Sequence, residues 1–150
     1  MGVTKQDTIN VLLVEDNEGD ILLTKETFAE IESPVNLHVV KDGEDAMAFL
    51  MKEGDFQDAI TPDIILLDLN IAKISGFDIL QKIKATPHLK LIPVIVLSTS
   101  NKDKDILDSY KNYVNCYITK PVDLDEFAEI IQNIEKFWFK TVKLPTLMDK

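Results

Sequence analysis

The arrangement of five short apolar runs constrains the fold more than any other feature of this sequence. The runs alternate with stretches whose apolar residues recur at helical spacing, without an internal repeat or a linker. Such alternation predicts an α/β domain, in which helices connect parallel strands and cover both faces of their sheet. Strands are predicted at 9–14, 35–40, 63–68, 93–98 and 114–119, and helices at 18–32, 43–53, 75–85, 102–112 and 124–140.

The character of the runs predicts the order of the strands. The runs at 9–14, 64–67 and 94–97 are almost continuously apolar, which is typical of parallel strands buried on both faces. The runs that begin at Val35 and Val114 alternate between apolar and polar residues, so each should have one wet face and lie at an edge. We therefore expect a flavodoxin-like five-stranded parallel sheet in the order 2-1-3-4-5, with its switch point between the first and third strands.

Polar residues follow four of the predicted strands. Glu15 and Asp16 follow the first, Asp68 the third, Ser98 the fourth and Lys120 the fifth. Taken one at a time, these residues are as easily explained as loop starts, helix caps or turns. Together they offer complementary charges and donors beyond the carboxyl ends of parallel strands, where open sheets of this type bind ligands. We expect them to meet in one pocket.

The chemistry of this set points to phosphoryl groups. A carboxylate such as Asp68 can accept a phosphoryl group covalently. That group bears roughly two negative charges, and like unit charges 4 Å apart repel by about 4 kcal/mol at an effective dielectric near 20. A divalent cation removes this obstacle, and Mg²⁺ prefers one or two carboxylates together with substrate oxygens and water. Mg²⁺ is therefore the expected cofactor.

Each remaining residue has an expected part in that chemistry. Asp16 supplies a carboxylate to the metal, Glu15 acts directly or through water, and a backbone carbonyl at Asn70 can also ligate. Lys120 compensates negative charge as a compact ammonium. Ser98 donates a hydrogen bond to the phosphoryl oxygen.

Composition narrows the class of partner. The net charge is −10 over 150 residues, and the sequence contains no arginine, so direct nucleic-acid binding is not expected. No run of 18 apolar residues is present and the first residues do not resemble a signal peptide, which predicts a cytoplasmic protein without membrane contact. Cys116 is the single cysteine, so no disulfide can form within the chain.

Four motifs resemble those of the receiver domains of two-component response regulators, over about residues 9–135. The motifs are Leu12–Asn17, Pro62–Asn70, Val94–Ser98 and Tyr117–Pro121. The resemblance implies that Asp68 is the phospho-acceptor, that Glu15 and Asp16 hold magnesium, that Ser98 and the aromatic Tyr117 switch position, and that Lys120 pairs with the phosphate. It also implies a cis peptide between Lys120 and Pro121.

The chain departs from this family at three loop positions. Ala72 stands where the family commonly has proline, and Ser75 precedes Gly76 where aspartate is common. Thr99 follows Ser98 where a small residue is frequent, which could slow access of the phosphoryl donor. Ser75 is still a good N-cap for the next helix, so we expect the loop to keep its form.

The C-terminal segment refines the resemblance. We expect a single domain, 1–150, with its core at about 9–135 and an apolar extension at 136–150. This extension, together with Glu15–Asp20 and Asp68–Asn70, resembles the small single-domain response regulators of bacterial phytochrome histidine kinases. In that group the segment helps to form a homodimer. The alternative is that Trp138 and its neighbours fold back over their own domain.

The sequence thus predicts a phospho-acceptor switch rather than an enzyme, one that assists its own phosphorylation and dephosphorylation. A sensor histidine kinase, of the phytochrome type by resemblance, would donate the phosphoryl group, and an unidentified downstream protein would read the conformational change. A scaffold receiver that is never phosphorylated is the main alternative. An aspartate-nucleophile phosphatase is disfavoured because Asn70 stands where such enzymes use a second acid. A flavin or nucleotide carrier is disfavoured by the acidic loop at Glu15–Glu18.

Overall fold

The five predicted strands form one parallel sheet in the order β2-β1-β3-β4-β5. The computed structural model describes residues 8–145. The strands are β1 (Ile9–Val14), β2 (Val35–Val40), β3 (Ile64–Leu67), β4 (Val94–Ser98) and β5 (Cys116–Thr119). The predicted order and flavodoxin-like winding are confirmed, and the first two strands have the predicted bounds.

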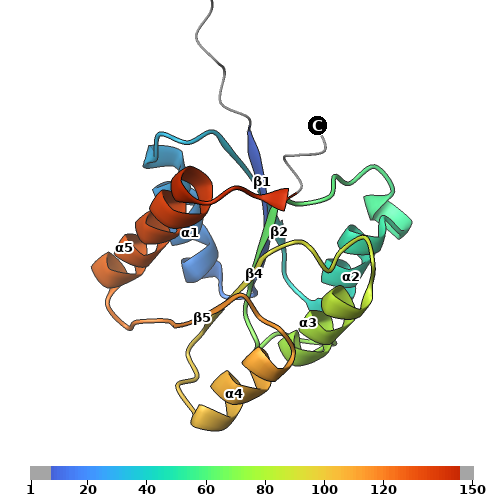
Figure 1. Ribbon diagram of the computed structural model, residues 1–150. Coiled ribbons are helices and arrows are strands. Elements are labelled where there is room, and N and C mark those ends of the chain that lie inside the picture. The colour runs from blue at the N-terminus through green and yellow to red at the C-terminus, as the bar shows by residue number, and fades with distance from the viewer. Residues whose placement is uncertain (1–7, 146–150) are drawn as a thin grey trace, which may run out of the picture.

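Five α-helices connect and flank the strands (Figure 1). They are α1 (Glu18–Glu30), α2 (Gly43–Met51), α3 (Gly76–Ala85), α4 (Asp103–Lys111) and α5 (Leu124–Ile134). A short 3₁₀ turn, Gly54–Phe56, follows α2. Side-chain caps set several of the helix starts: Asn17, Asp42, Ser75 and Asp123 each accept a backbone N–H three residues on.

Alternation along the strands divides the apolar side chains between two cores. On one face, Leu12, Ile65 and Val94 pack beneath α2 and α3. On the other, Val11, Ile64 and Ile95 pack beneath α1 and α5. Figure 1 shows the same division, with α1 and α5 on one side of the sheet and α2 and α3 on the other. Both cores depend on the period of two in β1, β3 and β4, so a one-residue slip would exchange them.

The last helix does not continue as the predicted α-helix to residue 140. It changes at Glu135 into a π-helix, Glu135–Thr141, within which the side chains are displaced from α-helical spacing. As a result Phe139 is buried against Phe28, with ring centroids 5.8 Å apart, whereas Phe137 remains 52% exposed. The apolar segment therefore folds back in part over its own domain.

A buried hydrogen bond connects this segment to the loop between α1 and β2. The Ser33 hydroxyl donates to the Glu135 carboxylate over 2.5 Å, and both side chains are buried. Lys140 lies 3.3 Å from the same carboxylate. Leu144 is also buried, whereas residues 146–150 of the predicted extension, including Leu147, lie outside the described residues. Among residues 8–145 no helix is long and apolar enough to cross a membrane.

Candidate functional site

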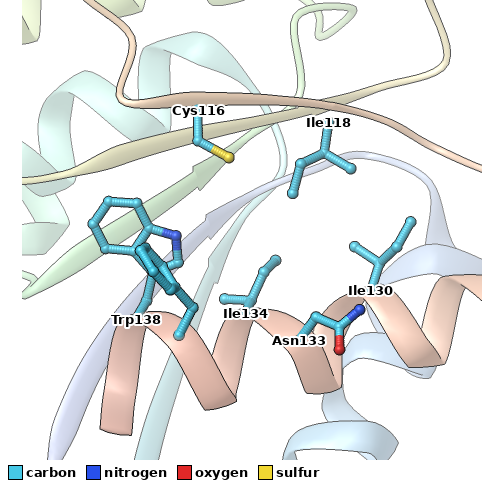
Figure 2. Close-up of a pocket in the computed structure, with 7 residues that line it drawn as sticks. Cys116, Ile118, Ile130, Asn133, Ile134 and Trp138 are labelled. Atoms are coloured by element: carbon cyan, nitrogen blue, oxygen red, sulfur yellow. The ribbon is translucent and has the colours of Figure 1, made fainter. Parts of the chain in front are cut away.

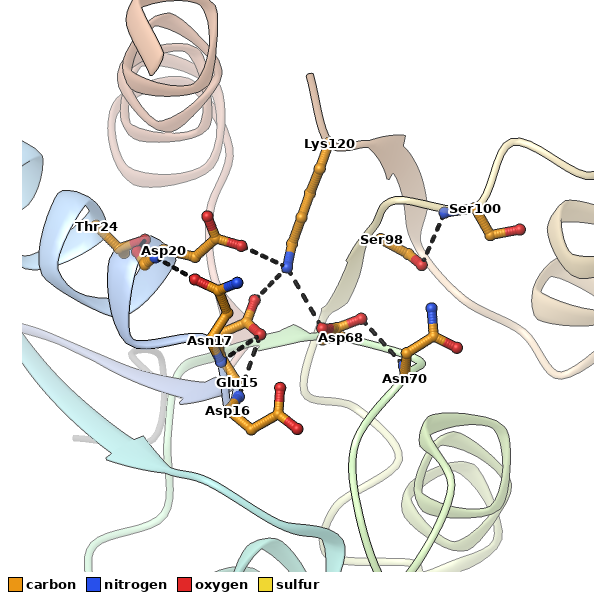
Figure 3. A network of polar contacts seen from close by, with 10 residues as sticks. All are labelled: Glu15, Asp16, Asn17, Asp20, Thr24, Asp68, Asn70, Ser98, Ser100 and Lys120. Atoms are coloured by element: carbon orange, nitrogen blue, oxygen red, sulfur yellow. Dashed lines mark hydrogen bonds and ion pairs between the residues drawn. The ribbon is translucent and has the colours of Figure 1, made fainter. Parts of the chain in front are cut away.

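The register of the sheet brings the predicted polar residues to one edge. β1 and β3 are neighbours that pair Val14 with Leu67, so the residues that follow them emerge side by side. The Asp68 amide donates to the Val14 carbonyl over 3.0 Å, and the Lys120 amide donates to the Ser98 carbonyl over 2.7 Å. Figure 3 shows the resulting cluster at the carboxyl ends of the strands.

Three carboxylates form the acidic part of this cluster. Oxygens of Glu15, Asp16 and Asp68 lie within 4.8 Å of one another. Glu15 and Asp68 are buried, whereas Asp16 is exposed and gives the group access to solvent. Three oxygen donors at this spacing, with one side open to water, match the preference of Mg²⁺ or Mn²⁺ for carboxylate and water ligands. The residues present therefore fit a divalent cation.

Lys120 supplies the counter-charge for the acids. The Lys120 side chain is 5% exposed, and its Nζ donates to Glu15, to Asp20 over 2.9 Å and to Asp68 over 3.3 Å. Figure 3 shows Lys120 on one side of the acidic cluster, with its ammonium in contact with these three carboxylates. The predicted cis peptide after it is absent: the described residues contain no cis peptide bond, and Lys120–Pro121 has the ordinary trans form.

Asp20 is a member of the site that sequence reasoning missed. It lies in the first turn of α1, where acids are common because they favour the helix dipole, so its sequence context marks it as a helix start. Asn17 caps its amide over 2.9 Å and so fixes the start of the helix with Asp20 facing Lys120. The sequence does contain a signal for Asp20. It comes four residues after Asp16, and this spacing places both acids near the N-terminal end of α1.

Burial and charge shift the pKa values of the innermost pair. Burial of Glu15, and the nearby charge of Asp68, raise its pKa to about 7 although Lys120 opposes the rise. Burial alone would lower the pKa of Lys120, but hydrogen bonds to Glu15 and Asp20 and the charge of Asp68 raise it. Lys120 is therefore a permanent cation, whereas Glu15 exchanges its proton near neutral pH in the metal-free protein.

This shift predicts that the metal-free protein loses stability as the pH rises. The folded-state pKa of Glu15 lies above its ordinary value of 4.5, so the stabilisation is complete below pH 4.5 and is lost as the pH rises through about 7. Between pH 5 and pH 8, in EDTA, we expect the free energy of unfolding of the parent to fall by about 1–2 kcal/mol more than that of Glu15→Gln. Thermal unfolding of both proteins at each pH measures this difference.

A matched control for that experiment is Asp42→Asn. A backbone hydrogen bond at the start of α2 lowers the pKa of Asp42. The contribution of Asp42 to stability is therefore constant between pH 5 and pH 8 and is lost only in acid. A parent and a Glu15→Gln variant that respond identically to pH would contradict the assignment of the titration to Glu15.

Asn70 and Ser98 flank the acids on the opposite side from Asp20. The Asn70 amide donates to the Asp68 carboxylate over 3.0 Å, while its own side chain is exposed. The hydroxyl of Ser98 is buried and accepts the Ser100 amide at 3.3 Å. Both lie near Asp68 in Figure 3, with Ser98 across from Lys120.

Tyr117 stands apart from the acid cluster. Its hydroxyl donates to the Ser100 carbonyl over 2.7 Å, and its half-buried ring packs at the border of the core beneath α2 and α3. Ser98 and Tyr117 are therefore joined through the same residue, Ser100, rather than directly.

The loop that follows Asp68 is anchored despite its unusual sequence. The Gly43 amide donates to the Ala72 carbonyl over 3.0 Å, and Lys73 lies 3.3 Å from Asp42. Ser75 caps α3 as predicted, by accepting the Asp78 amide. A side chain at Gly76 would meet the Leu69 backbone at 2.5 Å, so only glycine permits this close approach. A hydrogen bond and an ion pair thus connect the start of α2 to this loop.

Comparison with known proteins gives a consistent result. The profile of the response regulator receiver domain matches residues 11–132. The response regulator Rcp1 of Synechocystis sp. (strain ATCC 27184 / PCC 6803 / Kazusa) is 43% identical over 135 residues, which cover 90% of this chain and 92% of Rcp1.

Two crystal structures resemble the whole fold. The phosphorylated cyanobacterial phytochrome response regulator RcpA superposes with a TM-score of 0.90 at 47% identity, over 93% of this chain and 99% of RcpA. The Mn²⁺-bound form of Rcp1 superposes with a TM-score of 0.89 at 42% identity, over 91% of this chain and 99% of Rcp1.

Proposed function

Because the chain belongs to the response regulator receiver family, we propose that it is a single-domain response regulator that accepts a phosphoryl group on Asp68. The observation that carries this proposal is the buried Asp68 carboxylate between two further acids and the Lys120 ammonium. In the proposed cycle a sensor histidine kinase donates the group, and a downstream protein recognises the altered surface. We propose that the phosphoryl transfer and the recognition by the downstream protein both take place in the cytoplasm.

The transfer step follows from the positions of these groups. An oxygen of the Asp68 carboxylate attacks phosphorus, and a new P–O bond forms while the bond from phosphorus to the donor breaks. The donor leaves with the electron pair of that bond and later takes up a proton. Lys120 balances the charge that moves onto the protein, and the Ser98 hydroxyl donates to a phosphoryl oxygen. The Asn70 amide holds Asp68 in its attacking orientation.

Mg²⁺ is the proposed cofactor. Glu15, Asp16 and Asp68 would hold it, together with the Asn70 carbonyl. When bound, the cation neutralises the repulsion between the Asp68 carboxylate and the incoming phosphoryl oxygens. The Mn²⁺-bound form of Rcp1, similar in sequence and fold, supports a divalent cation in this family.

Phosphorylation would act by shifting the population of two conformations. Ser98 would move toward the phosphoryl oxygen, and Tyr117 would follow because both side chains are bonded to Ser100. The affected surface is the one formed by α4, β5 and α5. For a decisive shift, phosphorylation must favour one state by several kcal/mol.

Intact mass measurement tests the proposal. The protein is incubated with acetyl phosphate and Mg²⁺, and in parallel with EDTA. One added phosphoryl group is expected with Mg²⁺ and none with EDTA. If acetyl phosphate fails, the cognate histidine kinase serves as donor. Failure with both donors would contradict the proposed function and favour a scaffold receiver.

We propose a phytochrome-type histidine kinase as the donor. The similarity to RcpA, a phytochrome response regulator, at 47% identity over nearly its whole length supports this partner. A kinase of that type should phosphorylate this chain faster than an unrelated histidine kinase does at equal concentration.

We also propose a homodimer through α5 and the segment that follows it. An apolar groove of about 250 Å³ lies between β5, an edge strand, and this helix. Figure 2 shows the side chains of β5 and α5 that line it. Ile118, Ile130, Phe137 and Trp138 line it, and the ring of Phe137 makes an edge-to-face contact with that of Trp138. An exposed apolar groove of this kind is typical of a surface that a second copy covers.

Phe137→Glu is expected to convert the dimer to a monomer. A carboxylate placed in an apolar interface loses its hydration without a partner, which weakens association by at least tenfold. Light scattering during size-exclusion chromatography at micromolar concentration measures the change. Leu22→Glu, at an exposed position on α1, is the matched control and should leave the dimer intact. A monomeric parent, or a dimeric Phe137→Glu variant, would contradict this interface.

A further inference from the structure

Two adjoining hollows lie far from the acidic site, between the C-terminal ends of α3 and α4. Their volumes are about 280 and 330 Å³, and both are lined by Lys84 and Tyr113. Lys90 and Leu91 complete the second hollow. The nearby Asn115 amide donates to the carbonyl of Val94, the first residue of β4, so this surface is at the amino ends of the strands. It faces away from Asp68.

The charge of this surface is opposite to that of the protein. The chain has a net charge of −10, yet among the residues that the structure describes no acidic residue lines either hollow. Within residues 8–145 neither Lys84 nor Lys90 takes part in an ion pair, and Lys84 instead donates to the neutral side chain of Asn115 over 2.9 Å. Burial without a counter-charge lowers the pKa of Lys84. An anion brought here would therefore gain more than at an ordinary exposed lysine.

Tyr113 has an unfavourable backbone conformation that its own packing does not explain. It has φ +66° directly after the C-cap of α4, and the Val114 amide donates to the Ser109 carbonyl over 3.1 Å. This helix ending strongly favours glycine, because a side chain in the left-handed region costs energy. The tyrosine side chain is 76% exposed, so burial does not offset that cost. Because the exposed ring at this strained position also lines both hollows, it is suited to contact with another molecule.

We propose that the two hollows form a docking site for an acidic, partly apolar peptide segment of a partner protein. Lys84 and Lys90 would meet its carboxylates, and Tyr113 and Leu91, which is 67% exposed, would cover an apolar side chain between them. A free phosphate ion would leave the two apolar side chains without a partner. A nucleic acid would be repelled by the net negative charge of the protein.

NMR titration of the ¹⁵N-labelled full chain tests this proposal. The probe is a short synthetic peptide of glutamate and leucine, and its control replaces every glutamate with glutamine. We expect shifts at the amides of Lys84, Lys90, Leu91 and Tyr113 with the acidic peptide, and at least threefold weaker binding to Lys84→Gln. Absence of these shifts at millimolar peptide, or equal binding of the glutamine peptide, would overturn the proposal.

Tyr113→Gly separates docking from a structural role. Removal of the ring should weaken peptide binding at least fivefold, while the Tm stays at the parent value or rises by up to about 3 °C because the strained conformation is relieved. Lys52→Gly is the matched control, since Lys52 also has a left-handed conformation, φ +57°, after a helix end but does not line either hollow. It should leave peptide binding unchanged. A Tm below that of the parent for Tyr113→Gly, or unchanged peptide binding, would overturn the proposal.

Discussion

Asp68→Asn is expected to abolish the metal-dependent gain of one phosphoryl group rather than to slow it. The asparagine oxygen can still accept the Asn70 amide that holds residue 68, now at 3.0 Å, so the shape of the site is preserved. The anionic oxygen that attacks phosphorus is lost, however, and an amide is not a nucleophile of comparable strength. Intact mass after incubation with acetyl phosphate and Mg²⁺ measures the difference.

A control variant and a stability measurement make this result specific. Asp63→Asn changes a buried carboxylate just before the same strand, where Asp63 accepts the Asn10 amide over 2.8 Å, and it should leave phosphorylation intact. Asp68→Asn should also raise the Tm of the metal-free protein by about 3 °C, because it removes one of three crowded like charges. Phosphorylation of the Asp68→Asn variant to the extent of the parent would contradict the assignment of Asp68.

Lys120→Met is expected to lower the Tm by about 10 °C. The substitution leaves the carboxylates of Glu15, Asp20 and Asp68 without their shared cation. Removal of one partner from a buried ion pair typically costs about 3–5 kcal/mol, because the remaining charge has neither water nor a counter-charge. Thermal unfolding in EDTA measures this loss without a contribution from the metal.

The pH dependence and a surface variant test whether the loss of Tm in Lys120→Met comes from the unpaired carboxylates. The deficit of Lys120→Met should be larger at pH 8 than at pH 6, since protonation of Glu15, whose pKa is already about 7, relieves part of the repulsion. Lys41→Met removes an exposed ion pair with Glu18, 2.6 Å in length, and should cost at most about 1 kcal/mol. Equal losses for Lys120→Met and Lys41→Met would contradict the central position given to Lys120.

The strands of this protein are readily predicted from sequence because burial on both faces requires continuous apolar runs. The bounds of Ile9–Val14 and Val35–Val40 are predicted without error, and the parallel order follows from which runs alternate. The sequence also places Glu15, Asp16, Asp68 and Lys120 together at the carboxyl ends of the strands, because each comes within two residues of a strand end. Topology alone brings these residues together.

The remaining features depend on geometry that residue patterns do not specify. Asp20 lies in the first turn of α1, which Asn17 caps, and from there its carboxylate contacts Lys120. The π-helix begins at Glu135, whose carboxylate accepts a hydrogen bond from the buried Ser33 hydroxyl, 102 residues away in the sequence. The strained conformation of Tyr113 has no sequence signal, since glycine, the residue usual at such a position, is absent there.

Chemical mapping of the phosphorylated residue tests the central claim most directly. An acyl phosphate on an aspartate is reduced by borohydride to homoserine, which peptide mass mapping locates. After incubation with Mg²⁺ and acetyl phosphate, or with the cognate kinase, the account predicts homoserine at position 68 and at no other aspartate. Homoserine at Asp16 or Asp20 instead, or a phosphoryl group that resists borohydride, would contradict the account.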